Sequence, residues 1–342
     1  MSEHSMIVYI YSMVVCRVYK SWSSRLNWSI NPRSFLTPRY VDQCSEQSER
    51  TCMISFWKIL ANLKNLSFSS NRRVKILDSL VLSLIRRMTS LEVLSLRLFL
   101  TDSSTNIEST YLNREVLPYL PNLRTFNVDI CNYASSHSGA LGQHAKEIQH
   151  LSYNGQCHPL VCYTARSRYG SVCSHVFSLP FMFDRMQLIC SSFSGDLFPN
   201  VRHVSFSDLY GPFEHAFFVQ IATSFPRLTD LTIIDSSLQE EKQIRRSNGT
   251  EPTAPAVKFN HLNDLLLIGR HGDYAEQLLV ETNTLLPRLT KLTIDYEPLF
   301  IVTENFTRNA TRRNCMNIEH LDLSEPFAFS EEMCLYFPRL CS

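Results

Sequence analysis

Five side chains of the types that bind zinc lie close together near the middle of the sequence. They are Cys157, His158, Cys162, Cys173 and His175. Thiolate sulfur and imidazole nitrogen are the usual tetrahedral ligands of structural zinc. The spacing of these residues matches neither a Cys-x-x-Cys pair nor the other ligand spacings of zinc modules. We therefore expect buried cysteines that bind no metal, and no cofactor of any other kind.

Acidic pairs are the second candidate for chemistry, because two carboxylates can act as general acid and general base. Glu240 and Glu241 lie in a polar stretch, where solvation accounts for them, and Glu331 and Glu332 lie at an expected helix start, where negative charge is favourable. The sequence contains no Gly-x-Ser-x-Gly, no Gly-rich phosphate loop before a lysine and no His-Glu-x-x-His. We predict that the chain is not an enzyme.

The composition is that of a folded protein without a strong overall charge. Of 342 residues, 44% are hydrophobic and 19% are charged, and the formal net charge is +1. Such a chain has no field that attracts nucleic acid or an anionic membrane, so we expect neither as a partner. The apolar run at residues 6–16 is too short to span a bilayer. The 11 cysteines are odd in number and scattered, which favours a reducing, intracellular compartment, cytoplasmic or nuclear.

A spacing of apolar residues recurs along most of the chain. The pattern is Leu-x-x-Leu-x-Leu, with any large apolar residue at the three positions, and it returns at intervals of roughly 25 to 34 residues with one interval about twice as long. Leu-Pro or Phe-Pro precedes several occurrences, and proline ends a preceding helix. The nine occurrences begin at Leu63, Leu91, Leu123, Ile148, Val201, Leu228, Leu262, Leu289 and Ile318.

Periods of this length are typical of leucine-rich repeats. We therefore predict an α/β fold, a leucine-rich-repeat-like solenoid with strands on the concave face and helices or irregular crossovers on the convex face. The solenoid takes residues 57–342 and includes an exposed loop at 236–258, while residues 1–56 form a poorly predicted N-terminal segment that is partly disordered. Leu231 and Leu292 are expected at equivalent buried sites of one continuous core.

The residues that alternate with the buried positions are predicted to form a binding surface. Successive side chains of a strand point to opposite faces, so the residue between the last two apolar positions faces outward. This residue is small and polar in eight of the nine units, and its neighbours carry charge of both signs, which suits a protein partner better than phosphate. The expected protein-binding residues of the concave face are Ser152, His203, Ser205, Asp230, Thr232, Lys291, Thr293, His320 and Asp322.

Several motifs of the second half carry a family resemblance, among them Phe181-Met182-Phe183-Asp184-Arg185, Phe198-Pro199-Asn200-Val201, Phe225-Pro226-Arg227-Leu228 and Asp295-Tyr296-Glu297. With them the chain resembles a lineage-expanded family of F-box-type proteins with degenerate leucine-rich repeats. The resemblance implies a substrate receptor of a cullin-type ubiquitin ligase, whose F-box helices bind the ligase adaptor and whose repeats bind the target. Residues 1–52 lack the Leu-Pro-x-Glu-like opening of an F-box, so the adaptor is an expected partner only if an F-box lies upstream.

Two functions are therefore open, and both have an unknown protein as the partner. One is the substrate-binding part of an F-box and leucine-rich-repeat ubiquitin-ligase receptor. The other is a free-standing leucine-rich-repeat interaction scaffold without a ligase connection. A secreted leucine-rich-repeat protein is a third alternative, suggested by Asn-x-Thr triplets at Asn305 and Asn309. The odd number of cysteines argues against the full pairing that this alternative requires. In the repeat consensus, the ninth position carries Asn or Cys to bond the turn backbone, and only Asn71 and Cys131 fit.

Overall fold

A computed structural model describes residues 62–74, 82–101, 107–134, 145–166, 172–188, 196–208, 213–234, 255–269, 272–323 and 331–340. The predicted N-terminal segment at 1–56 lies outside the described residues, and so does most of the predicted loop at 236–258. The end of that loop is described, and it contains the two-residue strand β10 (Val257–Lys258).

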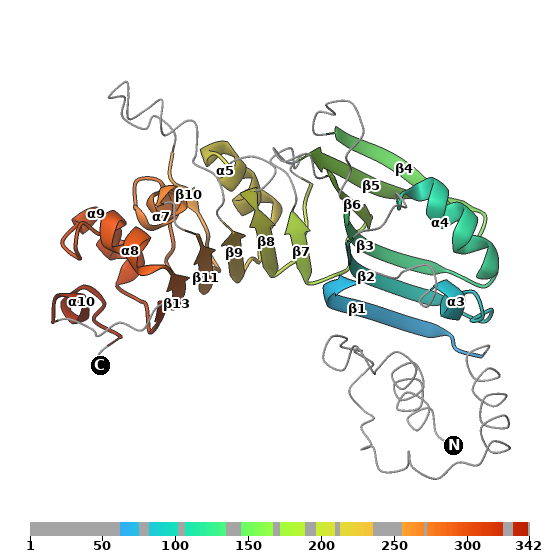
Figure 1. Cartoon of the computed structure of the whole chain (residues 1–342), viewed down its shortest axis with the longest axis horizontal. Helices are drawn as coiled ribbons and strands as arrows, with labels where there is room; N and C mark the ends of the chain where they lie inside the picture. Colours follow the sequence, from blue (N-terminus) through green and yellow to red (C-terminus); the bar gives the residue numbers. More distant parts are fainter. Residues whose placement is uncertain are drawn as a thin grey trace, which may run out of the picture. The chain divides into compact units, whose positions relative to one another are not determined.

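The chain divides into two compact units. The first comprises Met1–Ser135, Glu147–Cys162 and Ser174–Pro180, and the second comprises Ser136–Lys146, Tyr163–Cys173 and Phe181–Ser342. The described strands form two six-stranded sheets and one two-stranded sheet (Figure 1). Sheet A has the strand order β1-β2-β3-β6-β5-β4, and sheet B has the order β14-β13-β11-β9-β8-β7. The third sheet pairs β10 with β12 (Thr284–Leu285).

Sheet A consists of long strands with short helices between some of them. Its strands are β1 (Asn65–Val74), β2 (Val93–Thr101), β3 (Thr125–Ala134), β4 (Ala145–Tyr153), β5 (Gln156–Arg166) and β6 (Val172–Ser178). The helices are α3 (Leu82–Ile85), α4 (Ser109–Glu115) and the 3-10 helix η2 (Leu117–Tyr119).

Parallel and antiparallel pairs both occur in sheet A. Strands β1, β2 and β3 are parallel, with Leu66 beside Leu94 and Leu94 beside Phe126. Strands β4 and β5 are neighbours joined by only Asn154 and Gly155, whose φ angles of 53° and 67° fit a two-residue hairpin. A loop this short joins antiparallel strands, because a parallel pair needs a crossover of a dozen or more residues.

One face of sheet A packs against α4 and the segments near it in a continuous apolar core. Leu96, Val128 and Val176 contribute to this core from three neighbouring strands, and Leu112 contributes from α4. These side chains alternate along their strands with residues of the opposite face, as the period-two pattern predicts.

Helix α4 also bonds the outer edge of β4, the last strand of sheet A. The side-chain amide of Asn113 donates a hydrogen bond of 3.0 Å to the carbonyl of His150, and its Oδ1 accepts one of 2.9 Å from the N–H of Ser152. The same strand carries Ile148 with 61% of its surface exposed. Backbone groups of an edge strand have no neighbouring strand on one side, and Asn113 binds two of them.

Sheet B consists of short strands alternating with helices. Its strands are β7 (Arg185–Leu188), β8 (His203–Ser207), β9 (Asp230–Ile234), β11 (Asp264–Ile268), β13 (Lys291–Ile294) and β14 (His320–Leu323). The described helices of this part are α5 (His215–Ser224), α7 (Asp273–Leu279), α8 (Tyr296–Val302), α9 (Asn309–Cys315) and α10 (Glu331–Tyr336).

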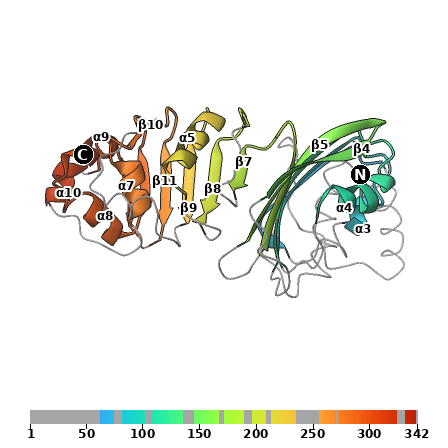
Figure 2. The same ribbon diagram turned by 90° about the horizontal axis from the view of Figure 1, so that it is seen from above.

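Apolar side chains at alternate positions form the buried face of sheet B. Leu265 lies between Leu231 and Leu292 in register, and all three are buried. The ring of Phe206 on β8 lies 5.1 Å from that of Phe217 on α5. Helices therefore cover this face, and the view from above shows α5 next to β8 and β9 (Figure 2).

Neighbouring strands of sheet B begin in the same way. The N–H groups of Thr229 and Asp230 both donate to the carbonyl of Arg202, at 2.8 and 3.0 Å. Those of Asn263 and Asp264 donate likewise to the carbonyl of Thr229, at 2.8 and 3.1 Å. These hydrogen bonds align the first residues of neighbouring strands across the sheet.

The prediction of a leucine-rich-repeat-like solenoid over residues 57–342 is wrong. The strands lie in three separate sheets, sheet A is mixed, and the chain from Ala145 to Ser178 runs through three long strands without a described helix. The predicted unit at Ile148 fails, because Ile148 is exposed. The physical reason is that the apolar spacing specifies a strand with one buried face, and it does not specify the order or direction of the strands.

The helices expected between the strands are only partly present. Apolar residues at helical spacing predict helices at residues 74–86, 213–225 and 274–286. The helix at 213–225 is present as α5. At residues 274–286 the helix ends at Leu279, and β12 follows. At residues 74–86, Val74 still belongs to β1 and the described helix is the single turn α3. In the described part of the chain, no helix has the length and apolar character to cross a bilayer.

Candidate functional site

The face of sheet B opposite the helices presents side chains in rows that cross the strands. The first polar row follows the register through Arg185, His203, Asp230, Asp264, Lys291 and His320. The second row is polar except at Leu266, and it follows the register through Gln187, Ser205, Thr232, Leu266, Thr293 and Asp322. Every one of these side chains is half-buried or exposed, whereas the residue between the two rows is buried on each strand. We call this surface the open face of sheet B.

Ion pairs link neighbouring strands along the first polar row. His203 Nδ1 lies 3.0 Å from Asp230 Oδ2, and Lys291 Nζ lies 3.0 Å from Asp264 Oδ2. All four side chains are partly open to solvent, so each pair contributes little to stability, about 0 to 1 kcal/mol. The row therefore offers charged groups that a partner can bind without first disrupting the core.

Lys291 is surrounded by carboxylates. Its hydrogen bond to Asp264 and the attraction of that charge raise the pKa of the Lys291 ammonium above its ordinary value, and Asp322 and Asp230 contribute smaller attractions in the same direction. Asp322 is exposed and makes no hydrogen bond or ion pair within the described residues. The lysine is thus the single ammonium among three carboxylates.

Two aliphatic side chains extend the open face toward the ends of the strands. Ile234 on β9 and Ile268 on β11 are neighbours in register, with 41% and 47% of their surfaces exposed. A small apolar hollow opens beside Ile268, lined also by Ile233, Leu267, Tyr274, Ile294 and Pro298. Ligand sites of enzymes combine an apolar hollow with several convergent polar groups. This hollow is lined almost entirely by apolar side chains, and most of them come from buried strand positions and from α7 and α8. It therefore lies toward the helix side of the sheet and is neither a polar ligand site nor part of the open face.

Eight of the nine predicted binding residues lie on the open face of sheet B. They are His203, Ser205, Asp230, Thr232, Lys291, Thr293, His320 and Asp322. Ser152 is the exception, because it lies on β4 at the edge of sheet A. The sequence reasoning did not single out Ile234 and Ile268. Both directly follow a buried strand position, so the period-two pattern could have placed them on the same face.

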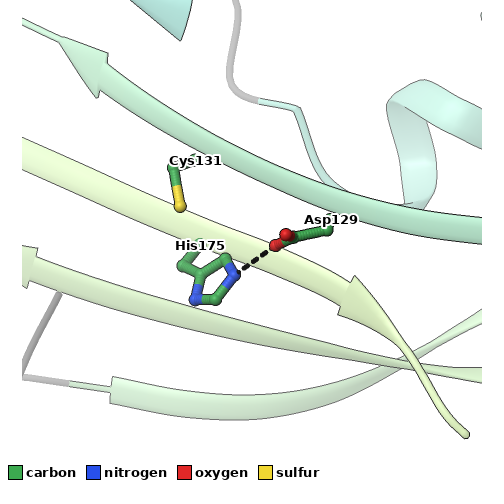
Figure 3. A group of neighbouring side chains, drawn as sticks. All are labelled: Asp129, Cys131 and His175. Carbon is green, nitrogen blue, oxygen red and sulfur yellow. Dashed lines mark hydrogen bonds and ion pairs between the residues drawn. The ribbon is translucent and has the colours of Figure 1, made fainter. Parts of the chain in front are cut away.

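A second group of side chains lies buried in sheet A. Asp129 and Cys131 of β3 and His175 of β6 each offer one ligand-type atom, and these atoms lie within 4.8 Å of one another (Figure 3). The exposed fractions of the three residues are 2%, 1% and 1%. Asp129 and Cys131 share a face because they are two residues apart on one strand, and β6 lies next to β3 in the sheet.

The carboxylate of Asp129 is the centre of this group. Its Oδ1 lies 2.8 Å from His175 Nε2, and its Oδ2 accepts a hydrogen bond of 3.2 Å from Arg97 Nε. The ring of Phe177 lies 5.0 Å from the imidazole. A buried carboxylate is stabilised when both of its oxygens have partners and an opposite charge lies beside it, here the Arg97 guanidinium. Oxygen, sulfur and nitrogen donors together are a set that zinc accepts.

The five zinc-type residues singled out in the sequence do not come together. Among the described residues, the only group with metal-binding geometry contains His175 but takes its other members from β3. Cys162 and Cys173 are buried and Cys157 is exposed, and none of the three is in a disulfide. His158 stacks on Tyr153 with ring centroids 3.9 Å apart. The expectation that these cysteines are buried is therefore confirmed for Cys162 and Cys173 and wrong for Cys157.

Two further cysteines bear on the sequence analysis. Cys131 was expected in a turn at the ninth repeat position, but it lies inside β3. Cys334 of α10 is disulfide-bonded. Disulfides are typical of oxidising compartments. The cysteines therefore do not decide between a reducing and an oxidising compartment.

No known protein family, curated protein or solved structure matches this chain. The resemblance to F-box-type proteins gains no support from these comparisons.

Proposed function

We propose that the open face of sheet B binds another protein through an extended segment that carries a basic and an aliphatic side chain. The observation that supports this proposal is the arrangement of half-exposed side chains in register on five neighbouring strands, next to the exposed pair Ile234 and Ile268. Apolar side chains surrounded by polar ones are typical of protein interaction sites.

The charge of this face favours a basic partner. Asp230, Asp264 and Asp322 lie around the single ammonium of Lys291, and Arg185 is at the β7 end of the row, so three negative and two positive charges leave the face with one negative charge when the histidines are counted as neutral. Asp322, the most exposed of the three, is ready to accept a bond from a partner's lysine or arginine. Complementary charge increases the rate of association and selects among partners.

The spacing along the strands sets the spacing in the partner. Asp230 and Ile234 are the two ends of β9 and both belong to the open face. Four residues of a strand span about 13 Å. A partner in extended conformation that lies along β9 therefore places its basic and aliphatic side chains about four residues apart.

A library of displayed random peptides, selected on the full chain, tests the proposal. Selected peptides should be enriched in lysine or arginine about four residues from isoleucine, leucine or valine, and they should bind less tightly as salt increases. Thr232→Arg places a long cation in the middle of the face and should abolish binding. Ile268→Asp should weaken it at least tenfold.

The matched control is Thr223→Arg, the same substitution at an exposed position of α5. Because α5 covers the opposite side of sheet B, this variant should bind as the wild type does. Selected peptides that are acidic, or that bind Thr232→Arg and wild type equally, would refute the proposal.

A connection to a ubiquitin ligase stays a prediction. The segment that would contain an adaptor-binding F-box, residues 1–52, lies outside the described residues. The absence of enzymatic activity and the intracellular location also stay predictions.

A further inference from the structure

We propose that Asp129, Cys131 and His175 bind one zinc ion inside sheet A. This site is separate from the open face of sheet B, and it depends on different residues and a different sheet. Each of the three side chains is of a type that ligates zinc: a carboxylate oxygen, a thiolate sulfur and an imidazole nitrogen.

The distances are close to those that zinc requires. Zinc bonds of about 2.0 Å to nitrogen or oxygen and 2.3 Å to sulfur place the donors of a tetrahedral site about 3.5 Å apart. The three donor atoms already lie within 4.8 Å of one another. His175 Nε2 and Asp129 Oδ1 are 2.8 Å apart, so they would separate by roughly half an ångström to admit the ion between them.

Protons and charges balance when the ion binds. The Cys131 thiol loses its proton to solvent and binds as thiolate. Without metal, His175 Nε2 donates its proton to Asp129. When zinc binds, this proton is exchanged through solvent for one on Nδ1, so the ring releases no net proton and the Nε2 lone pair becomes a ligand in place of the hydrogen bond. The thiolate and the carboxylate carry two negative charges against the two positive charges of zinc, and the Arg97 guanidinium leaves the whole group with one positive charge. The described residues supply three ligands, and a water molecule completes the tetrahedron.

Arg97 positions the carboxylate rather than the metal. Its Nε bonds Asp129 Oδ2, which leaves Oδ1 directed at His175. A ligating carboxylate that is itself hydrogen-bonded is a common arrangement at metal sites, because the outer partner orients the ligand.

Burial determines when the ion can enter. The three ligands are almost completely buried, so zinc must bind as the chain folds. The full chain should therefore be unfolded in chelator and refolded with and without zinc. The measurements are zinc per chain by elemental mass spectrometry and the midpoint of thermal unfolding.

We expect one zinc ion per refolded wild-type chain and a higher midpoint with zinc than without. Cys131→Ser and His175→Gln should lose the ion and the zinc-dependent rise in midpoint. Cobalt in place of zinc should give a thiolate-to-cobalt absorption band in the wild type that Cys131→Ser lacks. Cys162→Ser is the matched control, because Cys162 is also a buried thiol of sheet A but lies outside the group. It should keep the ion.

Two results would overturn the proposal. One is a wild-type chain that refolds to the same circular dichroism spectrum and the same midpoint with and without zinc, whatever the variants do. The other is equal loss of zinc from Cys131→Ser and Cys162→Ser. This would show that zinc is lost because the structure of sheet A is disturbed and not because a ligand is missing. Either result would leave Asp129 as the centre of a hydrogen-bonded network only.

Discussion

Sheet A and sheet B place their charged side chains in opposite environments. In sheet A, the buried carboxylate of Asp129 bonds both Arg97 and His175, which are also buried. In sheet B, the pair of Lys291 and Asp264 stays partly open to solvent. Both sheets use the same alternation of side chains along a strand. What differs is the exposure of these side chains, so we propose a large partner for the open face of sheet B and only an ion for the buried group of sheet A.

Removing charge from the buried network should give the largest effect. Asp129→Asn keeps the shape of the side chain but leaves the Arg97 guanidinium buried without a carboxylate. Loss of one member of a buried ion pair costs about 3 to 5 kcal/mol. Urea unfolding of the full chain measures this loss. A cost below about 1 kcal/mol would mean that water reaches the network and that sheet A differs little from sheet B in this respect.

Truncation of the buried row of sheet B should cost nearly as much. Leu231→Ala and Leu292→Ala each remove a fully buried side chain and should destabilise by about 2 to 5 kcal/mol in urea unfolding. Thr232→Ala, one residue away on the open face, is the control, with an expected change within about 0.5 kcal/mol. Equal losses at Leu231 and Thr232 would contradict the assignment of the two faces.

A buried thiol in the second unit predicts sensitivity to alkali. Burial raises the pKa of Cys315 from 9.0 to about 12. Between these values the unfolded chain has lost the thiol proton and the folded chain keeps it. Stability therefore falls as pH rises, by at most about 1.4 kcal/mol per pH unit.

Cys315→Ala should remove that slope, whatever it costs in absolute stability. The exposed Cys157 provides the control, because Cys157→Ala should leave the slope unchanged. Unfolding free energies measured at several pH values above 9 compare the three chains. A wild-type slope that persists in Cys315→Ala would assign the alkali sensitivity to other groups.

The exposed ion pair of sheet B should give the smallest effect. Asp264→Asn should change the unfolding free energy at neutral pH by about 0 to 1 kcal/mol, because both side chains are partly solvated. Asp264 raises the pKa of Lys291, so the pair stabilises the fold below the unfolded lysine pKa. This contribution is lost as pH rises through the pKa of Lys291 in the folded chain. The unfolding free energies of the variant and the wild type should then converge. A loss at neutral pH similar to that of Asp129→Asn would remove the contrast between the sheets.

The sequence predicted local features better than their arrangement. Leu231 and Leu292 are buried as expected, and Thr232 and Thr293 face outward, because alternation along a strand is a local property. The solenoid prediction was wrong because the pairing of β3 with β6 joins residues that are far apart in the chain. No local spacing specifies such a pairing. For the same reason Asp129 and Cys131 could not be joined to His175 from the sequence.

Asn113 has a consequence for the behaviour of the chain in concentrated solution. An edge strand with open backbone groups and an exposed isoleucine is a template on which a second copy can add a strand, and repeated addition leads to fibrils. The amide of Asn113 competes for two of those groups on β4, at His150 and Ser152. One side chain of a short helix thus acts against aggregation, a property that neither the binding face nor the buried network provides.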